Sequence, residues 1–247
     1  MRKFGLIGYP LSHSFSKKFF TEKFRDEQID GCEYELYPIE NIDLFADLLA
    51  NDQKLRGINV TIPYKVQVLP FLDEMDEAAK EIGAVNCISI QKNGSERKLI
   101  GYNTDAYGFE ESLKPLLETH HRRALIFGDG GAAKAIKYVL NKLGISYLVV
   151  TRKPTSDSIL YDAVDEALLL EYTILVNTTP LGMSPHIDTY PDIPYQYLTE
   201  KHVGYDLVYN PDRTYFLKQI EDRGGKVKNG LEMLHLQAIR SWEIWNA

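Results

Sequence analysis

The chain has 247 residues, of which 44% are hydrophobic and 26% are charged, a globular composition that excludes disordered, collagen-like and coiled-coil proteins. Its 35 acidic and 28 basic residues give a net charge of −7, which argues against nucleic-acid or anionic-membrane partners. Two cysteines are too few for a disulfide framework or a structural zinc site, so we expect no metal. No apolar run reaches the ~18 residues of a membrane span, and the first ten residues do not resemble a signal peptide. The expected localisation is cytoplasmic.

Short apolar strand patterns alternate with helical patterns along the chain. The Phe residues at 15, 19, 20 and 24 recur at helical spacing, as do apolar residues at 42–49 and 135–143. This alternation predicts an α/β fold with largely parallel sheets. Residues 85–91 and 97–102 flank Asn93-Gly94 and predict an antiparallel hairpin. The other predicted strands are 4–8, 33–37, 57–62, 125–127, 147–150, 174–176 and 203–207.

A polar segment at 118–123 precedes a new apolar strand, and we place a domain boundary just before it, within the helix that Asp105 would open. Apolar residues at helical spacing between Leu231 and Trp245 predict a long amphipathic helix, which we expect to return to the first domain. The sequence therefore predicts two α/β domains, 1–105 with 231–247 and 106–230. The first would have a mainly parallel mixed sheet and the second a Rossmann-type fold.

A glycine-rich turn follows the strand pattern that ends at Phe127. Gly128, Gly130 and Ala133 fit the pattern G-x-G-x-x-A. The first glycine makes the tight turn, the second admits a pyrophosphate, and the small third residue permits close helix–strand packing. Free backbone N–H groups at the start of the next helix would face the anion. The strand–turn–helix context favours a dinucleotide site over an ordinary glycine-rich turn.

The next predicted strand is followed by Thr151, Arg152 and Lys153. An NAD site usually has an acid about 20 residues after the glycines, which binds the ribose 2′-OH. Arg152 and Lys153 suit the 2′-phosphate of NADP instead, and the alternative is a solvated basic loop. Asp129 is unexpected beside a pyrophosphate, which a carboxylate repels, unless its side chain points away.

Polar residues also follow the strands of the first half. Ser14 and Ser16 open the first helix and can cap it or bind a carboxylate, a cap being the favoured interpretation when they are taken alone. Lys65 alone would be a surface lysine, and Asp105 alone would cap a helix that begins near Tyr107. Ligands of open α/β sheets bind beyond the strand ends. Several polar residues at such ends are therefore stronger evidence for a ligand site than any one of them.

The motifs occur in an order that resembles the shikimate dehydrogenase family over nearly the whole chain. One motif would be weak evidence, whereas eight in sequence are specific. The departures from the family pattern are Lys17-Lys18, Asp129 and the basic stretch at 151–153. The motifs are His13-Ser14-Phe15-Ser16, Asn59 to Lys65, Gly83 to Asn86, Asn103-Thr104-Asp105, Gly128 to Ala133, Asn177 to Met183, Tyr205 to Pro211, and Gly230 to Leu234 with Gln237-Ala238.

The resemblance implies reduction of 3-dehydroshikimate to shikimate with NADPH, a step of chorismate and aromatic amino acid biosynthesis. Lys65 and Asp105 would flank the carbon that changes oxidation state, and the loop from Asn177 would border the nicotinamide. Ser14, Ser16 and Tyr209 would hold the substrate carboxylate, and Thr61, Asn86 and Gln237 its ring hydroxyls. The implied NADP(H) residues are Gly128, Asp129, Gly130, Gly131, Ala132, Thr151, Arg152, Lys153, Thr178 and Gly230.

The chemistry of ketone reduction agrees with these roles. Hydride addition leaves negative charge on the ketone oxygen, which must then receive a proton. A cationic Lys65 within hydrogen-bond reach would stabilise that alkoxide and supply the proton. The cofactor carries the hydride, whereas the protein supplies orientation and charge.

Two alternatives stay open. The first is a quinate/shikimate dehydrogenase with broader substrate choice or NAD use, which Arg152 and the paired serines disfavour. The second is a noncatalytic NADP-binding sensor, which would have no need of both Lys65 and Asp105. His120-His121 is not a convincing metal site, because adjacent residues rarely point at one ion. The expected partner is a small-molecule substrate, and the chain would be a monomer or a homodimer.

Overall fold

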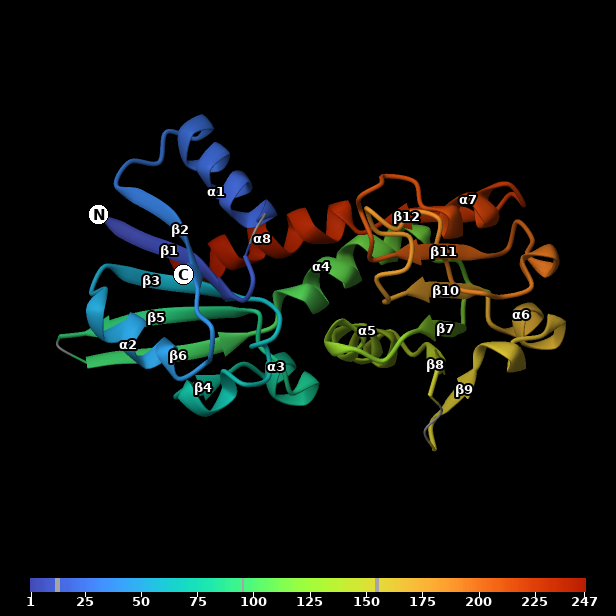
Figure 1. Cartoon of the computed structure of the whole chain (residues 1–247), viewed down its shortest axis with the longest axis horizontal. Helices are drawn as coiled ribbons and strands as arrows, with labels where there is room; N and C mark the ends of the chain where they lie inside the picture. The colour runs from blue at the N-terminus through green and yellow to red at the C-terminus, as the bar shows by residue number, and fades with distance from the viewer. Residues whose placement is uncertain (12–13, 95, 154–155) are drawn as a thin grey trace. The chain divides into compact units, whose positions relative to one another are not determined.

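Two six-stranded sheets organise the part of the chain that the computed structural model describes, residues 1–11, 14–94, 96–153 and 156–247 (Figure 1). The motif residue His13 and its neighbour Ser12 lie outside the described residues. The chain divides into two compact units, Met1–Thr104 with Gln237–Ala247 and Asp105–Leu236. The last eleven residues thus belong to the first unit, and the predicted domain bounds, 1–105 with 231–247 and 106–230, stay a prediction. The assignment of substrate binding to one unit and NADP binding to the other stays a prediction.

The sheet of the first unit is mixed. Its strand order is β2-β1-β3-β5-β6-β4; β1 pairs in parallel with β2 and β3, whereas β5 pairs antiparallel with β3 and β6. The β5–β6 pair is the hairpin predicted from Asn93-Gly94. The third strand ends at Val60 rather than at the predicted residue 62, because the chain turns towards Pro63, which has no N–H for a ladder. The strands are β1 (Arg2–Gly8), β2 (Cys32–Pro38), β3 (Leu55–Val60), β4 (Glu74–Met75), β5 (Cys87–Asn93) and β6 (Glu96–Tyr102).

Helices cover both faces of this sheet. On one face, α1 (Phe15–Asp26) and the end of α8 (Leu231–Asn246) pack their aromatic side chains together, with the ring centroids of Phe20 and Trp245 5.4 Å apart. Trp245 donates its indole N–H to the Ile88 carbonyl at 3.0 Å. A second apolar cluster contains Phe45 of α2 (Leu44–Asn51) and Ala79 of α3 (Glu77–Ile82). Burial of these apolar side chains is the main force that holds the unit together.

The sheet of the second unit is entirely parallel, with strand order β12-β11-β10-β7-β8-β9. With the six strands numbered in chain order within the unit and read from β9 to β12, this is the doubly wound order 3-2-1-4-5-6. The order reverses between β7 and β10. Dinucleotides bind beyond the carboxyl ends of the strands at such a switch point. The predicted Rossmann-type fold is therefore confirmed. The strands are β7 (Arg123–Phe127), β8 (Ser146–Thr151), β9 (Ser158–Leu160), β10 (Ile174–Asn177), β11 (Val203–Asp206) and β12 (Lys226–Asn229).

One helix boundary differs from the prediction. Helix α4 begins at Thr104 instead of near Tyr107, so Asp105 lies within its first turn and is not its cap. The reason is a long-range contact, since Asn86 Oδ1 accepts the backbone N–H of Thr104 at 2.6 Å. The remaining helices are α4 (Thr104–Leu113), α5 (Gly131–Lys142), α6 (Glu166–Glu171), α7 (Tyr215–Glu221) and the short 3₁₀ helices Leu69–Phe71, Lys114–Leu116, Tyr161–Ala163 and Tyr195–Tyr197.

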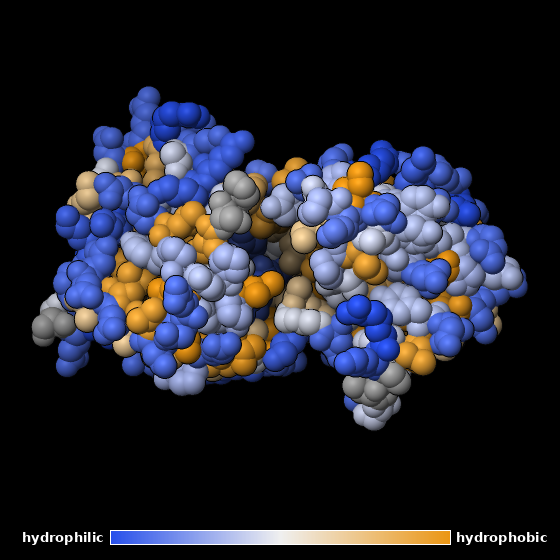
Figure 2. Space-filling view, in the orientation of Figure 1, coloured by the Kyte–Doolittle hydropathy of each residue, from blue (hydrophilic) through white to orange (hydrophobic). Residues whose placement is uncertain are grey.

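Polar residues cover most of the surface seen in Figure 2, with apolar residues scattered between them, as is usual for a globular protein. Among the described residues, no helix combines the length and apolar character that crossing a bilayer requires.

Candidate functional site

The turn after β7 has the backbone that a dinucleotide site needs. Gly128 has φ +97°, and a Cβ there would lie 2.7 Å from Thr179 Cγ2, so only glycine fits. Gly130 is the N-cap of α5 and provides no side-chain cap. A Cβ at Gly130 or Gly131 would meet nothing within 4 Å. The first N–H groups of α5 therefore have open space for an anion, and Ala133 is fully buried where the helix packs on the sheet.

The charge of Asp129, in the turn after β7, is balanced by a lysine of the following helix. Lys137, on α5, places its Nζ 2.5 Å from Asp129 Oδ1. This ion pair offsets the negative charge of Asp129, which would otherwise repel a pyrophosphate. The residue departs from the family pattern without leaving an uncompensated negative charge at the turn.

Arg152, the first residue after β8, lines an open groove of about 610 Å³. Arg152 and Lys153 are exposed, and the hydroxyl of Thr151 donates to the Lys153 carbonyl at 2.8 Å. Thr151 and Arg152 line the groove together with Asp162 and Asp192. The sequence patterns did not single out these two acids, because nothing in the chain order places them beside Arg152.

Two predicted cofactor residues have structural contacts of their own. The Thr178 hydroxyl donates to the Phe127 carbonyl at 2.8 Å and so joins the ends of β10 and β7. A Cβ at Gly230 would lie 2.2 Å from the Leu207 carbonyl oxygen. Gly230 therefore lets the start of α8 approach the chain after β11. Direct contact of either residue with a cofactor stays a prediction.

The serines of the first unit have different environments. Ser14 is the N-cap of α1, and its Oγ accepts the backbone N–H of Lys17 at 3.3 Å. The Ser16 hydroxyl forms a hydrogen bond with the buried Tyr34, whose pKa is raised well above its ordinary value by burial. The helix-cap interpretation is thus confirmed for Ser14, whereas carboxylate binding by either serine stays a prediction.

A buried hydrogen-bond network connects three residues with predicted substrate roles. From Ser16 it passes through Tyr34, whose hydroxyl donates to Asn59 Oδ1 at 2.8 Å, and Asn59 Nδ2 donates to Ser241 Oγ at 3.0 Å. Its centre is Thr104, whose hydroxyl accepts from Asn86 Nδ2 at 3.0 Å and donates to Gln237 Oε1 at 3.4 Å. The structure therefore brings Ser16, Asn86 and Gln237 into one network. Two further members, Asn59 and Thr104, lie in the quoted motifs but had no predicted role, and the sequence patterns did not point to Tyr34 or Ser241.

The remaining predicted residues occupy loops and helix ends. Thr61 and Lys65 follow β3, and the Lys65 carbonyl accepts the Val85 N–H at 2.8 Å. Lys65 and Asp105 are both half-buried. Tyr209 lies in the loop after β11 of the second unit and is 42% exposed. The pairing of Lys65 with Asp105, and of Tyr209 with the serines, stays a prediction.

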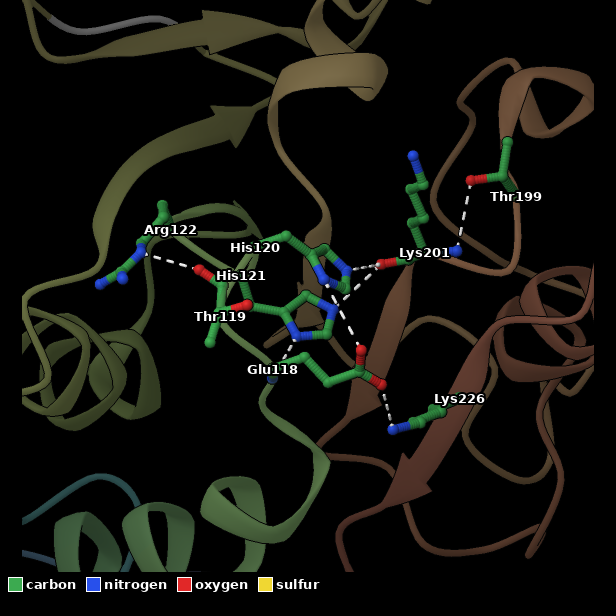
Figure 3. A network of polar contacts seen from close by, with 8 residues as sticks. All are labelled: Glu118, Thr119, His120, His121, Arg122, Thr199, Lys201 and Lys226. Atoms are coloured by element: carbon green, nitrogen blue, oxygen red, sulfur yellow. Dashed lines mark hydrogen bonds and ion pairs between the residues drawn. The ribbon is translucent and has the colours of Figure 1, made fainter.

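His120 and His121 have structural partners (Figure 3). Nε2 of the two rings lies 3.1 and 3.0 Å from the same acceptor, the Lys201 carbonyl oxygen. Nδ1 of His121 accepts the Glu118 N–H at 2.7 Å, and the Glu118 carboxylate pairs with Lys226 at 2.6 Å. These contacts fasten the segment before β7 to the loop before β11. Within the described ranges, no group of three or more His, Cys, Asp or Glu side chains could hold a metal ion.

Two buried histidines lead us to expect that the fold loses stability as the pH falls. Burial lowers the pKa of His121 and of His202, and His202 Nδ1 accepts the Thr199 N–H. The unfolded chain then binds these protons more readily, so the free energy of unfolding falls as the pH drops below about 6.5. His202→Gln should weaken this pH dependence, measured by urea unfolding between pH 7 and pH 5. Equal pH dependence in the variant and the wild type would contradict the assignment to His202.

Known proteins match the chain over nearly its whole length. The model of the shikimate dehydrogenase substrate binding domain matches residues 6–88. The shikimate dehydrogenase (NADP(+)) of Clostridium beijerinckii is 40% identical over 255 residues, which cover 99% of this chain and 92% of that protein.

Solved structures share the fold. The structure of the Thermus thermophilus enzyme with NADP(H) and shikimate aligns with a TM-score of 0.84 and 31% identity, over 99% of this chain and 93% of that one. The Listeria monocytogenes enzyme with shikimate and NAD aligns with a TM-score of 0.87 and 26% identity, over 100% and 92%. The resemblance carried by the eight motifs is thereby confirmed, and the chain belongs to the shikimate dehydrogenase family of NADP-dependent oxidoreductases.

Proposed function

We propose that the chain reduces 3-dehydroshikimate to shikimate with NADPH, reversibly, with Lys65 and Asp105 at the reacting carbon. The observation that carries the proposal is the open glycine turn at the switch point of the second sheet, in a chain that is 40% identical to a shikimate dehydrogenase (NADP(+)). The same reaction is a step of aromatic amino acid biosynthesis.

The second unit holds the cofactor in this proposal. Backbone N–H groups of Gly130, Gly131 and Ala132 bind the pyrophosphate. The Gly128 N–H donates to the Val150 carbonyl at 2.9 Å, so Gly128 serves the site through its turn conformation. Arg152 binds the 2′-phosphate in a bidentate manner, and Lys153 adds a point charge. Bound NADPH supplies the hydride. Thr178 and Gly230 shape the backbone on which the turn and the start of α8 depend.

The first unit holds most of the substrate. Ser14 and Ser16, with Tyr209, hydrogen-bond the substrate carboxylate, and Thr61, Asn86 and Gln237 bind the ring hydroxyls. The buried network supports the role of Asn86. The Thr104 backbone N–H can only donate, which fixes Asn86 Oδ1 as its acceptor. Asn86 Nδ2 has two hydrogens, and the Thr104 hydroxyl takes one of them. The other is the group that we assign to the substrate.

Lys65 and Asp105 have the roles in proton transfer. As the ketone is reduced, its oxygen gains negative charge, and the Lys65 ammonium stabilises that charge and donates a proton to the oxygen. In the oxidation, neutral Lys65 takes the proton from the hydroxyl. The Asp105 carboxylate accepts a hydrogen bond from the substrate.

The proposal is tested by steady-state rates with NADPH, comparing 3-dehydroshikimate with 3-dehydroquinate. We expect turnover of 3-dehydroshikimate and a much smaller kcat/KM for 3-dehydroquinate. Absence of turnover with 3-dehydroshikimate from neutral to alkaline pH would contradict the proposal.

A second candidate is a broader quinate/shikimate dehydrogenase that also uses NAD. Asp162 and Asp192 favour it, because they place negative charge in the groove that Arg152 lines. The Listeria monocytogenes relative was crystallised with NAD. Comparable kcat/KM values for NADH and NADPH, together with turnover of 3-dehydroquinate, would identify this candidate.

Both serines are expected to affect substrate binding and stability. A neutral hydroxyl contributes about 0.5–1.5 kcal/mol, so Ser14→Ala and Ser16→Ala should each raise KM for the ketone about 2- to 10-fold. Ser14→Ala also removes the cap of α1 and should lower the free energy of unfolding by about 1 kcal/mol. Ser16→Ala removes the hydrogen bond with Tyr34 and should lower it by a similar amount. The measurements are steady-state kinetics and urea unfolding, and lower stability with unchanged KM in both variants would leave the serines a purely structural role.

A further inference from the structure

The carboxylate of Asp206, the last residue of β11, is fully buried and accepts three hydrogen bonds. Its Oδ1 accepts from Asn177 Nδ2 at 2.9 Å and from the Val208 N–H at 3.0 Å, and its Oδ2 accepts from the Thr214 hydroxyl at 2.6 Å. All three donors are neutral, and burial raises the pKa of Asp206 to about 6. A buried acid held in this way is costly to ionise, and the proposed proton transfer makes no use of it.

One hydrogen bond leads to the glycine turn. Asn177, which donates to Asp206, accepts the Thr179 N–H at 3.1 Å and the Thr179 hydroxyl at 2.6 Å on its own Oδ1. Its Nδ2 also donates to the Leu181 carbonyl at 3.2 Å. Thr179 Cγ2 occupies the space that a Cβ at Gly128 would take. Asp206 therefore fixes, through Asn177, the segment that packs against the phosphate-binding turn.

The other two hydrogen bonds lead to Tyr209. Val208 immediately precedes Tyr209, and Thr214, the N-cap of α7, accepts the Leu217 N–H at 3.3 Å. The loop that carries Tyr209 is thus bonded to the same carboxylate at both of its ends. A backbone hydrogen bond from Ser184 N to the Asn210 carbonyl, 3.1 Å long, joins this loop to the segment after β10.

We infer that Asp206 is a positioning residue that sets both the 177–181 segment beside the cofactor turn and the loop that carries Tyr209. The inference rests on the proposed function, because that function assigns NADPH to the turn and the substrate carboxylate to Tyr209. Asp206 touches neither ligand in this account and acts through Asn177 and Val208. A purely structural role would affect folding and leave ligand affinity unchanged.

The test compares Asp206→Ala with Asp206→Asn and with a matched control. Asp206→Ala leaves Asn177 and Val208 without their acceptor, and a shift of about 1 Å in a binding group costs up to about 10²-fold. We expect KM for NADPH and for 3-dehydroshikimate to rise about 10-fold or more, with a smaller change in kcat, and the NADPH Kd from fluorescence titration to rise in parallel. Asp206→Asn can still accept at Oδ1 and donate its amide N–H to Thr214, so it should restore values near those of the wild type.

The matched control is Asp165→Ala in the same unit. Asp165 caps α6 by accepting the Leu168 N–H at 2.9 Å, so this variant should lower Tm while leaving the NADPH Kd and both KM values unchanged. Asn177→Ala separates the two connections, because it should raise the NADPH Kd and leave KM for the substrate unaffected. It also decides the question if Asp206→Ala fails to fold.

Three results would overturn the inference. The first is a loss of Tm in Asp206→Ala with both KM values and the NADPH Kd unchanged. The second is an Asp206→Asn variant as impaired as Asp206→Ala, and the third is an unchanged NADPH Kd in Asn177→Ala. Failure of the proposed function would be seen separately, as a wild type that does not turn over 3-dehydroshikimate, while the NADPH titration would still report on the connection to the turn.

Discussion

Lys65→Ala is expected to lower kcat by about 10²- to 10⁴-fold, which is the usual contribution of a positioned acid or base. Without the ammonium group, the alkoxide that forms on hydride transfer loses both its stabilising charge and its proton donor. KM for 3-dehydroshikimate should change much less, since the predicted serine, amide and hydroxyl ligands remain. Steady-state kinetics with NADPH provide the measurement.

The control for this variant is Lys80→Ala, which removes an exposed lysine of α3 in the same unit and should leave kcat unchanged. Asp105→Asn should also lower the rate, although its effect combines catalysis with substrate binding. If kcat of Lys65→Ala stays within a few-fold of the wild type, Lys65 is not the proton donor.

The second large effect is expected at Arg152, which lines the groove after β8. Hydrogen bonds to charged groups contribute about 1.5–3 kcal/mol, so Arg152→Ala should lower kcat/KM for NADPH about 10- to 100-fold. NADH has no 2′-phosphate and should be little affected. The ratio of kcat/KM for NADPH over NADH should therefore fall, without much improvement of the NADH reaction.

Lys153 can partly replace the charge that Arg152→Ala removes. The double variant with Lys153→Ala should therefore show a larger fall in the NADPH-to-NADH ratio than Arg152→Ala alone. Arg122→Ala is the control, because Arg122 precedes β7 at the opposite end of the sheet and should leave the ratio unchanged. An unchanged ratio in the double variant would show that another part of the chain recognises the phosphate. A wild type that prefers NADH would contradict the cofactor assignment.

Much of the fold is predictable from the sequence because its signals are local. Apolar strand patterns located the four central strands of the second sheet, β7, β8, β10 and β11, and Asn93-Gly94 located the β5–β6 hairpin. The apolar spacing between Leu231 and Trp245 predicted α8. The prediction missed β4, β9 and β12, which are two to four residues long and lie at sheet edges, where few apolar side chains mark a strand.

The start of α4 shows why helix ends are harder to predict. Asp105 is a good cap residue by type, but the contact at the start of the helix comes from Asn86, 18 residues earlier in the chain. Sequence patterns describe neighbours along the chain and contain no information on such a partner. The helix therefore begins one residue before Asp105.

The candidate site likewise has a part that the sequence predicts and a part that only the fold brings together. The glycine turn was visible because its residues are adjacent and each has a separate steric role. The buried network was not visible, although Asn59 lay in a quoted motif, since Asn59 and Ser241 are 182 residues apart in the chain and meet only in the folded unit. Asp206 lay within a quoted motif, but its function as an acceptor depends on Asn177 and Thr214, which the fold brings to it.

The most direct measurement of the proposed reaction follows the hydride itself. The purified chain would be incubated with 3-dehydroshikimate and with NADPH that carries deuterium at the reactive position of the nicotinamide, and the product would be analysed by mass spectrometry. We expect shikimate with one deuterium on the carbon that was the ketone, and almost no labelled shikimate from the Lys65→Ala variant in the same time. Absence of shikimate, or shikimate without deuterium, would contradict it.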